Sequence, residues 1–258
     1  GINTKYRAPE LIIQDELHLI SGPLGTLTGL YETAVDKLCQ KDGIKSKIIA
    51  STATIRNAKS QIKALYNRQY LQFPSQGTSI DDSYFAVMAK RQEKPARRYI
   101  GIAAPGSSMV ELLVRVYSSL IFASRYLINL EEFDDDVIDN YWTLVGYFNT
   151  LRDLGGASST IFDRVRQRYE YLINTKFKDL AHKFSYEDRG PWNNNELTSR
   201  KPSADIKQTL ENLEIGYPDE RAYDYILATN MLSVGIDIGR LGMMVVHSQP
   251  KTNAEYIQ

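Results

Sequence analysis

The chain has 258 residues, and its 31 Lys and Arg balance 31 Asp and Glu, so the formal net charge is zero. This balance excludes a histone-like basic protein, and a single cysteine, Cys39, excludes a disulfide framework and a Cys-rich zinc site. No apolar run reaches the ~20 residues that span a bilayer, and the polar residues 1–10 contain no signal peptide, so we expect a soluble cytoplasmic protein with no membrane partner.

Strands and helices alternate in the first part of the chain. The apolar residues Leu11, Ile12 and Ile13 run into carboxylates, as buried parallel strands with a charged exit do. The expected elements are, in order, a strand over residues 11–13, a turn over 21–25, a helix from 27 to about 43, a strand over 47–50 and a helix over 57–66. This order predicts a parallel sheet with helical crossovers.

A linker is expected to divide the chain into two lobes. Between residues 73 and 82 the composition shifts to Pro, Ser, Gln, Gly and Asp. We therefore expect residues 1–75 to form the C-terminal part of a first lobe, 76–97 the linker, and 98–258 most of a second lobe.

A second alternating series follows the linker. The expected elements are a strand over 99–103, a turn at 105–106, a helix over 109–126, a strand over 143–148, a largely helical stretch over 161–184, a loop over 190–195, a short strand over 196–198, a helix over 203–213 capped by Ser203, and strands over 225–228 and 243–246. The whole pattern predicts an α/β fold with parallel sheets.

The acidic pair Asp15–Glu16 follows the first strand. Ligands of parallel sheets bind beyond the carboxyl ends of the strands. Nucleotide hydrolysis needs one carboxylate that holds Mg²⁺ through its waters and another that orients the attacking water. A solvated helix-capping pair is the alternative. His18 follows closely; no His-Glu-x-x-His occurs, and three His with one Cys argue against a metal site built from soft ligands.

Three short motifs in the expected order resemble those of superfamily 2 helicases. Residues 15–18, Asp-Glu-Leu-His, resemble motif II of the Asp-Glu-x-His class; residues 52–54, Thr-Ala-Thr, resemble motif III; residues 228–238 resemble motif V. The resemblance covers nearly the whole chain and implies RecA-like lobes, the P-loop NTPase helicase fold. It implies that Asp15 (through water-bound Mg²⁺) and Glu16 are catalytic, and that the nucleotide state is coupled to lobe closure by His18, Thr52, Ala53, Thr54, Gly235 and Asp237.

Longer strings resemble the DUF1998-type helicases and the helicase subunit of the DISARM antiphage system. They are residues 14–25, 146–152, 196–200 and 249–258. This resemblance implies ATP and Mg²⁺ as cofactors, nucleic acid as partner with DNA preferred over RNA, and the subunits of a bacterial defence complex as further partners.

Two motifs of the superfamily are missing from these residues. No Gly-Lys-Ser/Thr phosphate-binding loop occurs, and the arginines of motif VI would follow Gln258. We therefore expect a fragment that runs from motif II to just before motif VI. An arginine finger alone contributes roughly 10³–10⁵ in rate, so the fragment is expected to lack useful ATPase activity.

Hydroxyl and glycine turns at strand exits are the expected nucleic-acid contacts. Helicase lobes grip one strand mainly through its phosphates, with backbone N–H groups, hydroxyls and helix N-termini. The residues are Gly106, Ser107, Asn149, Thr198, Arg200 and Thr229. A plain helix-capping role is the alternative for each Ser and Thr.

We interpret the charge-rich stretches 90–98 and 164–168 as solvated faces, with phosphate tracking as the alternative. The helical spacing of Tyr169, Leu172 and Ile173 indicates that these residues belong to the hydrophobic core. Two further functions stay open: a non-catalytic nucleic-acid-binding or scaffold module derived from a helicase, and an unrelated flavodoxin-like binding protein. The intact acidic pair argues against the first, and three ordered motifs argue against the second.

Overall fold

The chain divides into two compact units in a computed structural model, Gly1–Gly101 and Ile102–Ile257. The structure describes residues 8–20, 22–52, 57–75, 77–79, 82–83, 86–90, 92–93, 97–130, 132–184, 192–233 and 238–250. No helix in this described part is long and apolar enough to cross a membrane.

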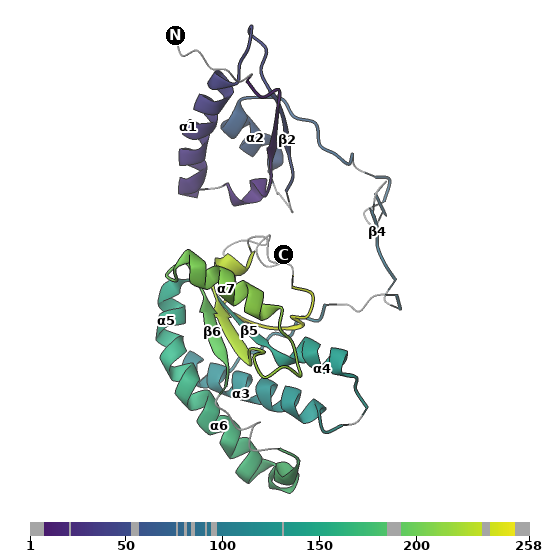
Figure 1. Cartoon of the computed structure of the whole chain (residues 1–258), viewed down its shortest axis with the longest axis vertical. Coiled ribbons are helices and arrows are strands. Elements are labelled where there is room, and N and C mark those ends of the chain that lie inside the picture. Colours follow the sequence, from purple (N-terminus) through teal and green to yellow (C-terminus); the bar gives the residue numbers. More distant parts are fainter. Residues whose placement is uncertain are drawn as a thin grey trace. The chain divides into compact units, whose positions relative to one another are not determined.

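The first unit is built on a two-stranded parallel sheet (Figure 1). Strands β1 (Leu11–Gln14) and β2 (Lys47–Ala50) pair in register, with Gln14 beside Ala50 at the carboxyl end. The other elements are a 3₁₀ turn η1 (Leu17–Leu19), helices α1 (Gly22–Leu38) and α2 (Ala58–Tyr66), and a short antiparallel pair, β3 (Asp82–Ser83) and β4 (Ala86–Val87). Both strands and the second helix lie where the sequence predicts them.

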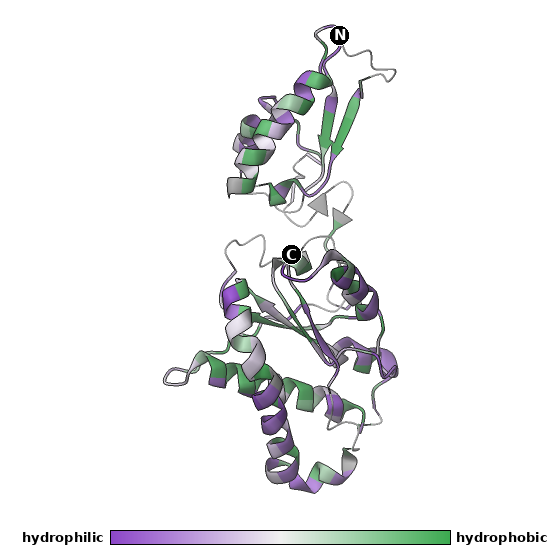
Figure 2. Ribbon diagram, turned by 60° about the vertical axis from the view of Figure 1, so that its left-hand side comes forward, coloured by the Kyte–Doolittle hydropathy of each residue, from purple (hydrophilic) through white to green (hydrophobic). Residues whose placement is uncertain are grey.

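Only one face of this sheet is covered. Leu17, Ile20, Leu65 and Tyr66 form a buried cluster against which Ile48, Ala50 and Ile62 pack. On the other face Ile13 is 74% exposed and Ile49 49% exposed, although both strands are apolar (Figure 2). Alternate residues of a strand point to opposite faces, so one packed helix covers half of them. The expected full burial of the first strand is therefore wrong for the residues that are described.

The expected turn over residues 21–25 is also wrong, because α1 already begins at Gly22. Proline is compatible with the first turn of a helix, where its missing N–H removes no helical hydrogen bond. The helix ends at Leu38 rather than near Gly43, which has φ +80° in the turn closed by a bridge between Lys41 and Ile44.

The second unit contains a four-stranded, all-parallel sheet in the order β6-β7-β5-β8. The strands are β5 (Leu144–Phe148), β6 (Asn194–Leu197), β7 (Tyr225–Ala228) and β8 (Met243–His247). Helices lie on both sides of the sheet, which gives three layers (Figure 1).

The helices of the second unit divide between the two faces. Their bounds are α3 (Met109–Leu127), α4 (Asp135–Trp142), α5 (Leu151–Thr160), α6 (Arg166–Tyr171) and α7 (Ser203–Leu213), with π-helical segments η2 (Ile161–Val165) and η3 (Leu172–Lys176) and 3₁₀ turns η4 (Lys178–Lys183) and η6 (Asn230–Ser233). Leu144, Phe148 and Leu227 pack with residues of α3 and of the helix that runs from α5 to η3. Leu197 and Ile226 face the other way and pack with Leu213 of α7.

Three sequence predictions fail here. Residues 99–103 form no strand, and Ile100 is 72% exposed, because an apolar run becomes a strand only where another strand pairs with it. Strand β6 begins at Asn194, inside the expected loop, because Asn194 and Asn195 pair with β7. Ser203 is the first residue of α7 behind an N-cap at Pro202, so it is not the cap.

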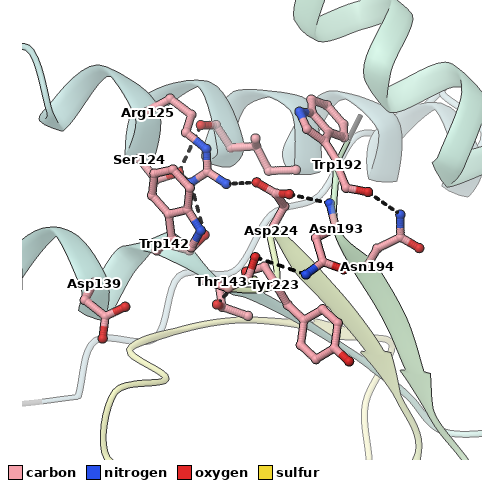
Figure 3. Close-up of polar contacts among 12 residues, drawn as sticks. Ser124, Arg125, Asp139, Trp142, Thr143, Trp192, Asn193, Asn194, Tyr223 and Asp224 are labelled. Atoms are coloured by element: carbon pink, nitrogen blue, oxygen red, sulfur yellow. Dashed lines mark hydrogen bonds and ion pairs between the residues drawn. The ribbon is translucent and has the colours of Figure 1, made fainter. Parts of the chain in front are cut away.

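A buried ion pair anchors the amino-terminal ends of β7 and of the edge strand β6 (Figure 3). Arg125 of α3 donates to Asp224, which directly precedes β7, and its Cζ lies 3.2 Å from the centroid of the Trp142 ring. The second oxygen of Asp224 accepts from the Asn193 N–H at 2.6 Å, just before β6. The Arg125 side chain is 1% exposed, so one desolvated charge pair fixes the residues that directly precede both strands.

Candidate functional site

The first candidate site lies at the carboxyl end of the two-stranded sheet. Because Gln14 pairs with Ala50, the next residues, Asp15 and Ser51, lie side by side. Asp15 Oδ1 accepts a hydrogen bond from the Ser51 hydroxyl and another, at 2.9 Å, from the Glu16 N–H. The Ser51 hydroxyl and then the Glu16 N–H hold the pKa of Asp15 below its usual value, so the carboxylate is ionised at neutral pH.

Glu16 adopts a left-handed backbone conformation, with φ 53° and ψ 43°. For a residue other than glycine this conformation is unfavourable, and such residues concentrate at functional sites. The effect here is to turn the chain sharply after β1, so that the Glu16 carboxylate returns toward His18, with Oε2 3.3 Å from Nδ1.

His18 connects this turn to the end of the neighbouring strand. Its side chain is 8% exposed, and Nδ1 lies 3.5 Å from the Thr52 hydroxyl. The turn is held from behind by Gln61 of α2, which donates to the carbonyl oxygens of Leu17 at 3.1 Å and Ile20 at 2.7 Å. The structure therefore brings Asp15, Glu16, His18 and Thr52 together.

The donors at this site suit a hard cation. Carboxylate and hydroxyl oxygens from Asp15, Glu16 and Ser51 are the ligand types of Mg²⁺, which proteins commonly bind through one or two carboxylates, several waters and substrate phosphates. Among the described residues no group of three or more His, Cys, Asp or Glu could hold a metal ion by itself. The site can therefore contribute to a shared Mg²⁺ site but does not enclose one.

Other predicted coupling residues, Ala53, Thr54, Gly235 and Asp237, lie outside the described residues. So do residues 251–258 of the expected approach to motif VI.

The second candidate site is the carboxyl edge of the four-stranded sheet, which we call the polar edge. The register pairs Leu197 with Ala228, Ala228 with Tyr147, and Phe148 with His247. The residues Thr198, Thr229 and His247 consequently continue three strands in one row. Asn149, one residue beyond β5, donates to the carbonyl oxygens of His247 at 3.3 Å and Gln249 at 2.8 Å.

Within the part of the chain that the structure describes, each of these four side chains has a buried polar atom without a hydrogen-bond partner. The atoms are Thr198 Oγ1, Thr229 Oγ1, Asn149 Oδ1 and His247 Nδ1. An unsatisfied buried polar group costs about 1–3 kcal/mol, and native proteins seldom leave one unless water or a ligand completes it. Four such atoms lie at one edge of one sheet, which makes this edge a candidate for contact with a polar ligand.

Arg200 lies near the polar edge but is paired. It donates to Glu196 through Nε at 2.9 Å and Nη2 at 2.5 Å, and a Cβ at Gly155 would lie 3.5 Å from its Nη1, which places it over α5. The first turn of α5 is capped by Thr150, whose hydroxyl accepts from the Asp153 N–H at 3.1 Å.

Gly106 and Ser107 lie in the turn before α3, where Gly106 has φ +88°. The cap of α3 is the following residue, Ser108, which accepts from the Glu111 N–H at 3.2 Å. No contact described in this unit joins Gly106 or Ser107 to the polar edge, so these two predicted residues are not brought together with the other four.

Sequence reasoning missed three residues of these sites, the first of which is Ser51, whose hydroxyl holds Asp15 at the exit of a predicted strand. Gln61 sits within a predicted helix, and nothing in its surroundings in the sequence shows that it reaches the η1 turn. His247 ends an apolar strand, and only the pairing of β5 with β8 reveals that it joins the polar edge. The position of a lone histidine at a strand exit was the one available signal.

Comparison with curated proteins shows similarity to helicases. The chain is 46% identical over 258 residues to the DISARM protein DrmA of Bacillus paralicheniformis, covering 98% of this chain and 22% of that protein. It is 25% identical over 242 residues to the uncharacterized ATP-dependent helicase MJ1574 of Methanocaldococcus jannaschii, covering 93% of this chain and 26% of that protein. The chain thus spans about a quarter of the length of these relatives. No protein-family model matches it.

Two crystal structures of the DUF1998 helicase MrfA share the fold. The structure bound to DNA has a TM-score of 0.57 at 15% identity and covers 96% of this chain and 28% of that chain. The structure bound to DNA and AMPPNP has a TM-score of 0.54 at 14% identity and covers 95% of this chain and 27% of that chain. The predicted α/β fold of RecA-like lobes is confirmed, as is the predicted resemblance to DISARM and DUF1998 helicases.

Proposed function

We propose that this chain is the part of a superfamily 2 helicase or translocase that carries the catalytic carboxylates and one nucleic-acid-binding surface. The observation that carries the proposal is the carboxylate site after β1, where Ser51 fixes an ionised Asp15 and a left-handed Glu16 presents a second carboxylate. A solvated helix-capping pair does not explain this arrangement, because neither carboxylate caps a helix: η1 has no side-chain cap.

The two carboxylates have different roles in the proposal. Asp15 is held in one orientation by two hydrogen bonds to Oδ1, which leaves Oδ2 for the water shell of a cation. Mg²⁺, when bound, would neutralise charge on the nucleotide phosphates. Glu16 orients the attacking water and accepts its proton. His18 and Thr52 link that carboxylate to the neighbouring strand, so that changes at the nucleotide reach the sheet. Ala53, Thr54, Gly235 and Asp237 are proposed to serve the same coupling.

The polar edge is proposed to hold the phosphates of one nucleic-acid strand. Thr198 and Thr229 supply neutral hydroxyl donors, and Arg200 supplies a cation that is already oriented by Glu196. Asn149 already donates both amide hydrogens to carbonyl oxygens, so its Oδ1 is proposed to accept from a base N–H of the same strand. Gly106 and Ser107 are proposed as a separate contact at the start of α3. Neutral donors suit a chain with zero net charge, because positioning contacts to phosphates need no bulk attraction. DNA is proposed as the substrate, which the DNA-bound state of MrfA supports.

The 258-residue polypeptide by itself is proposed to have no useful ATPase activity, because it contains no Gly-Lys-Ser/Thr loop to hold the phosphates. A cytoplasmic role in antiphage defence with complex subunits as partners is also proposed, and the similarity to a DISARM protein supports the defence part of it. Movement on one strand would follow from alternate gripping by two lobes as ATP is bound and hydrolysed.

The test is ATPase activity of the full-length protein that carries this chain, with and without single-stranded DNA. Glu16→Gln should lower kcat by at least about 10²-fold while ATP binding is retained, because general-base catalysis contributes about 10²–10⁴. Glu211→Gln, which removes an exposed carboxylate of α7, is the matched control and should leave kcat unchanged. Full activity in Glu16→Gln would refute the assignment, and absence of any DNA-stimulated ATPase in the wild-type protein would favour a non-catalytic scaffold.

A further inference from the structure

A second polar site lies on the second unit, far from the sheet edge. A hollow of about 230 Å³ opens between α3 and the α6 part of the long helix, lined by Glu111, Val114, Arg164, Gln167, Arg168 and Tyr171. We call it the α3–α6 hollow. At 1.5 Å per residue, Arg164 and Arg168 lie roughly 20–27 Å along the helix from its cap at Thr150, so the hollow is distinct from the polar edge.

The π-helical segments determine which residues face this hollow. Ile161, Val165, Tyr169 and Ile173 are all buried although they are four residues apart, a spacing that drifts by about 40° per step in a regular α-helix. The π segments η2 and η3 add residues to single turns and so correct the drift. The opposite face of this long helix is therefore also continuous along its length, and it is mostly hydrophilic (Figure 2).

Positive charge exceeds negative charge around the hollow. The Glu111 carboxylate accepts from Arg115 at 2.9 Å and from Arg164 at 2.6 Å, so one carboxylate is shared by two guanidinium groups. These hydrogen bonds hold the pKa of Glu111 below its usual value. Arg168 adds a third cation, and within the described residues it has no carboxylate or hydrogen-bond partner, as is true of Gln167. The lining itself carries Arg164 and Arg168 against Glu111, an excess of one positive charge, and Arg115 shares the Glu111 carboxylate from beside the hollow.

An aromatic ring completes the site. The Arg168 Cζ lies 4.9 Å from the centroid of the Tyr171 ring, and Tyr171 is 46% exposed. Because the guanidinium lies over one face of the ring, a base would stack on the other face while the guanidinium pairs with a phosphate, and the two groups together provide both parts of a nucleotide contact. An acidic protein segment would use the cations but has no use for the open ring.

We propose that the α3–α6 hollow binds one nucleotide of a nucleic-acid strand, with the phosphate against Arg164 and Arg168 and the base against Tyr171. The proposal rests on the proposed function in that it extends the same strand-binding unit by a second, independent contact. It also assigns a role to two arginines of the stretch 164–168, Arg164 and Arg168; for that stretch the sequence left a solvated face and phosphate tracking open.

The experiment measures binding of fluorescein-labelled single-stranded oligonucleotide to the 258-residue chain by anisotropy, over a range of salt concentrations. Arg164→Gln with Arg168→Gln should weaken binding about tenfold and reduce the slope of log K against log salt by about 0.7 per lost phosphate contact. The charge-matched control is Arg166→Gln with Lys207→Gln, both outside the hollow, and its slope should not change. Tyr171→Ala should weaken binding at least about fivefold, whereas Tyr171→Phe keeps the ring and should bind normally.

The outcomes separate this site from the polar edge. Equal losses in the two double variants would overturn the proposal, because total charge alone would then account for binding. Normal binding by the hollow variant together with loss in Asn149→Ala with Arg200→Gln would overturn the hollow and leave the polar edge intact. The reverse result would overturn the polar edge and leave the hollow. Absence of binding by the wild-type chain, or displacement of the oligonucleotide by poly-glutamate at equal charge, would overturn the hollow as a nucleic-acid site.

Discussion

Replacing Arg125 by Met tests how far the buried ion pair, at the opposite end of the sheet from the polar edge, supports the second unit. The substitution keeps an unbranched side chain of similar length but leaves the Asp224 carboxylate, 13% exposed, without its cation. It also removes the contact to the Trp142 ring. Breaking a buried pair from one side typically costs about 3–5 kcal/mol, because the remaining charge stays desolvated. For a unit of this size the expected fall in Tm is roughly 6–20 °C.

Tryptophan fluorescence during urea unfolding is the appropriate assay. The chain has two tryptophans, Trp142 and Trp192, and both belong to the second unit, so the fluorescence signal does not report unfolding of the first unit. Arg166→Met is the control, because it removes an exposed arginine that pairs with Glu170 on the same helix, and it should cost no more than about 0.5 kcal/mol.

A double variant distinguishes a lost pair from lost packing. Asp224→Asn keeps an acceptor for the Asn193 N–H but removes the negative charge. When it is combined with Arg125→Met, at least half of the lost stability should return, because no unpaired charge remains buried. A loss below about 1 kcal/mol for Arg125→Met, the range of exposed pairs, would refute the reasoning, as would a double variant no more stable than Arg125→Met alone.

Three other outcomes are expected. A Cβ at Gly146 would overlap the Tyr117 hydroxyl and lie 2.9 Å from Leu227 Cδ2, so Gly146→Ala should lower the free energy of unfolding by about 1–3 kcal/mol in the same assay. Tyr117→Phe removes a buried hydroxyl that has no partner among the described residues, and it should restore most of the lost stability. A double variant without that gain would contradict the overlap. Glu16→Gly should stabilise the first unit by about 1 kcal/mol, because glycine adopts the left-handed backbone conformation without strain. The gain would be measured as slower hydrogen exchange in β2. An equal gain in Glu16→Ala would contradict the role of backbone strain. Burial lowers the pKa of His247 below its usual value of 6.5, so the unfolded chain binds a proton at a pH where the folded chain does not. The stability of the second unit should therefore be fully present above pH 6.5 and fall as the pH decreases toward the folded pKa. His247→Asn should flatten that part of the stability curve.

Local pattern alone was enough to place most elements of this protein. The apolar runs that become β1, β2, β5, β7 and β8 are each short, and each is bounded by polar or turn residues, so periodicity and length sufficed to identify them. The pair Asp15–Glu16 followed from the same reasoning, since it lies at the exit of a predicted strand, whereas His18 and Thr52 were expected only from the resemblance to helicase motifs II and III. Residues that are close to the exits of neighbouring parallel strands meet whatever the rest of the fold does.

Tertiary structure decided what depends on distant partners. The apolar residues Tyr99 to Ala103 resemble those of β5, yet they form no strand, because strand formation needs a neighbour that local sequence does not reveal. The polar edge assembles only because the order β6-β7-β5-β8 aligns Thr198, Thr229 and His247 from segments far apart in the chain. The α3–α6 hollow depends likewise on two π-helical turns that keep Arg164 and Arg168 beside α3. Hydrogen bonds and helix register between remote segments are properties of the folded chain, and no local pattern encodes them.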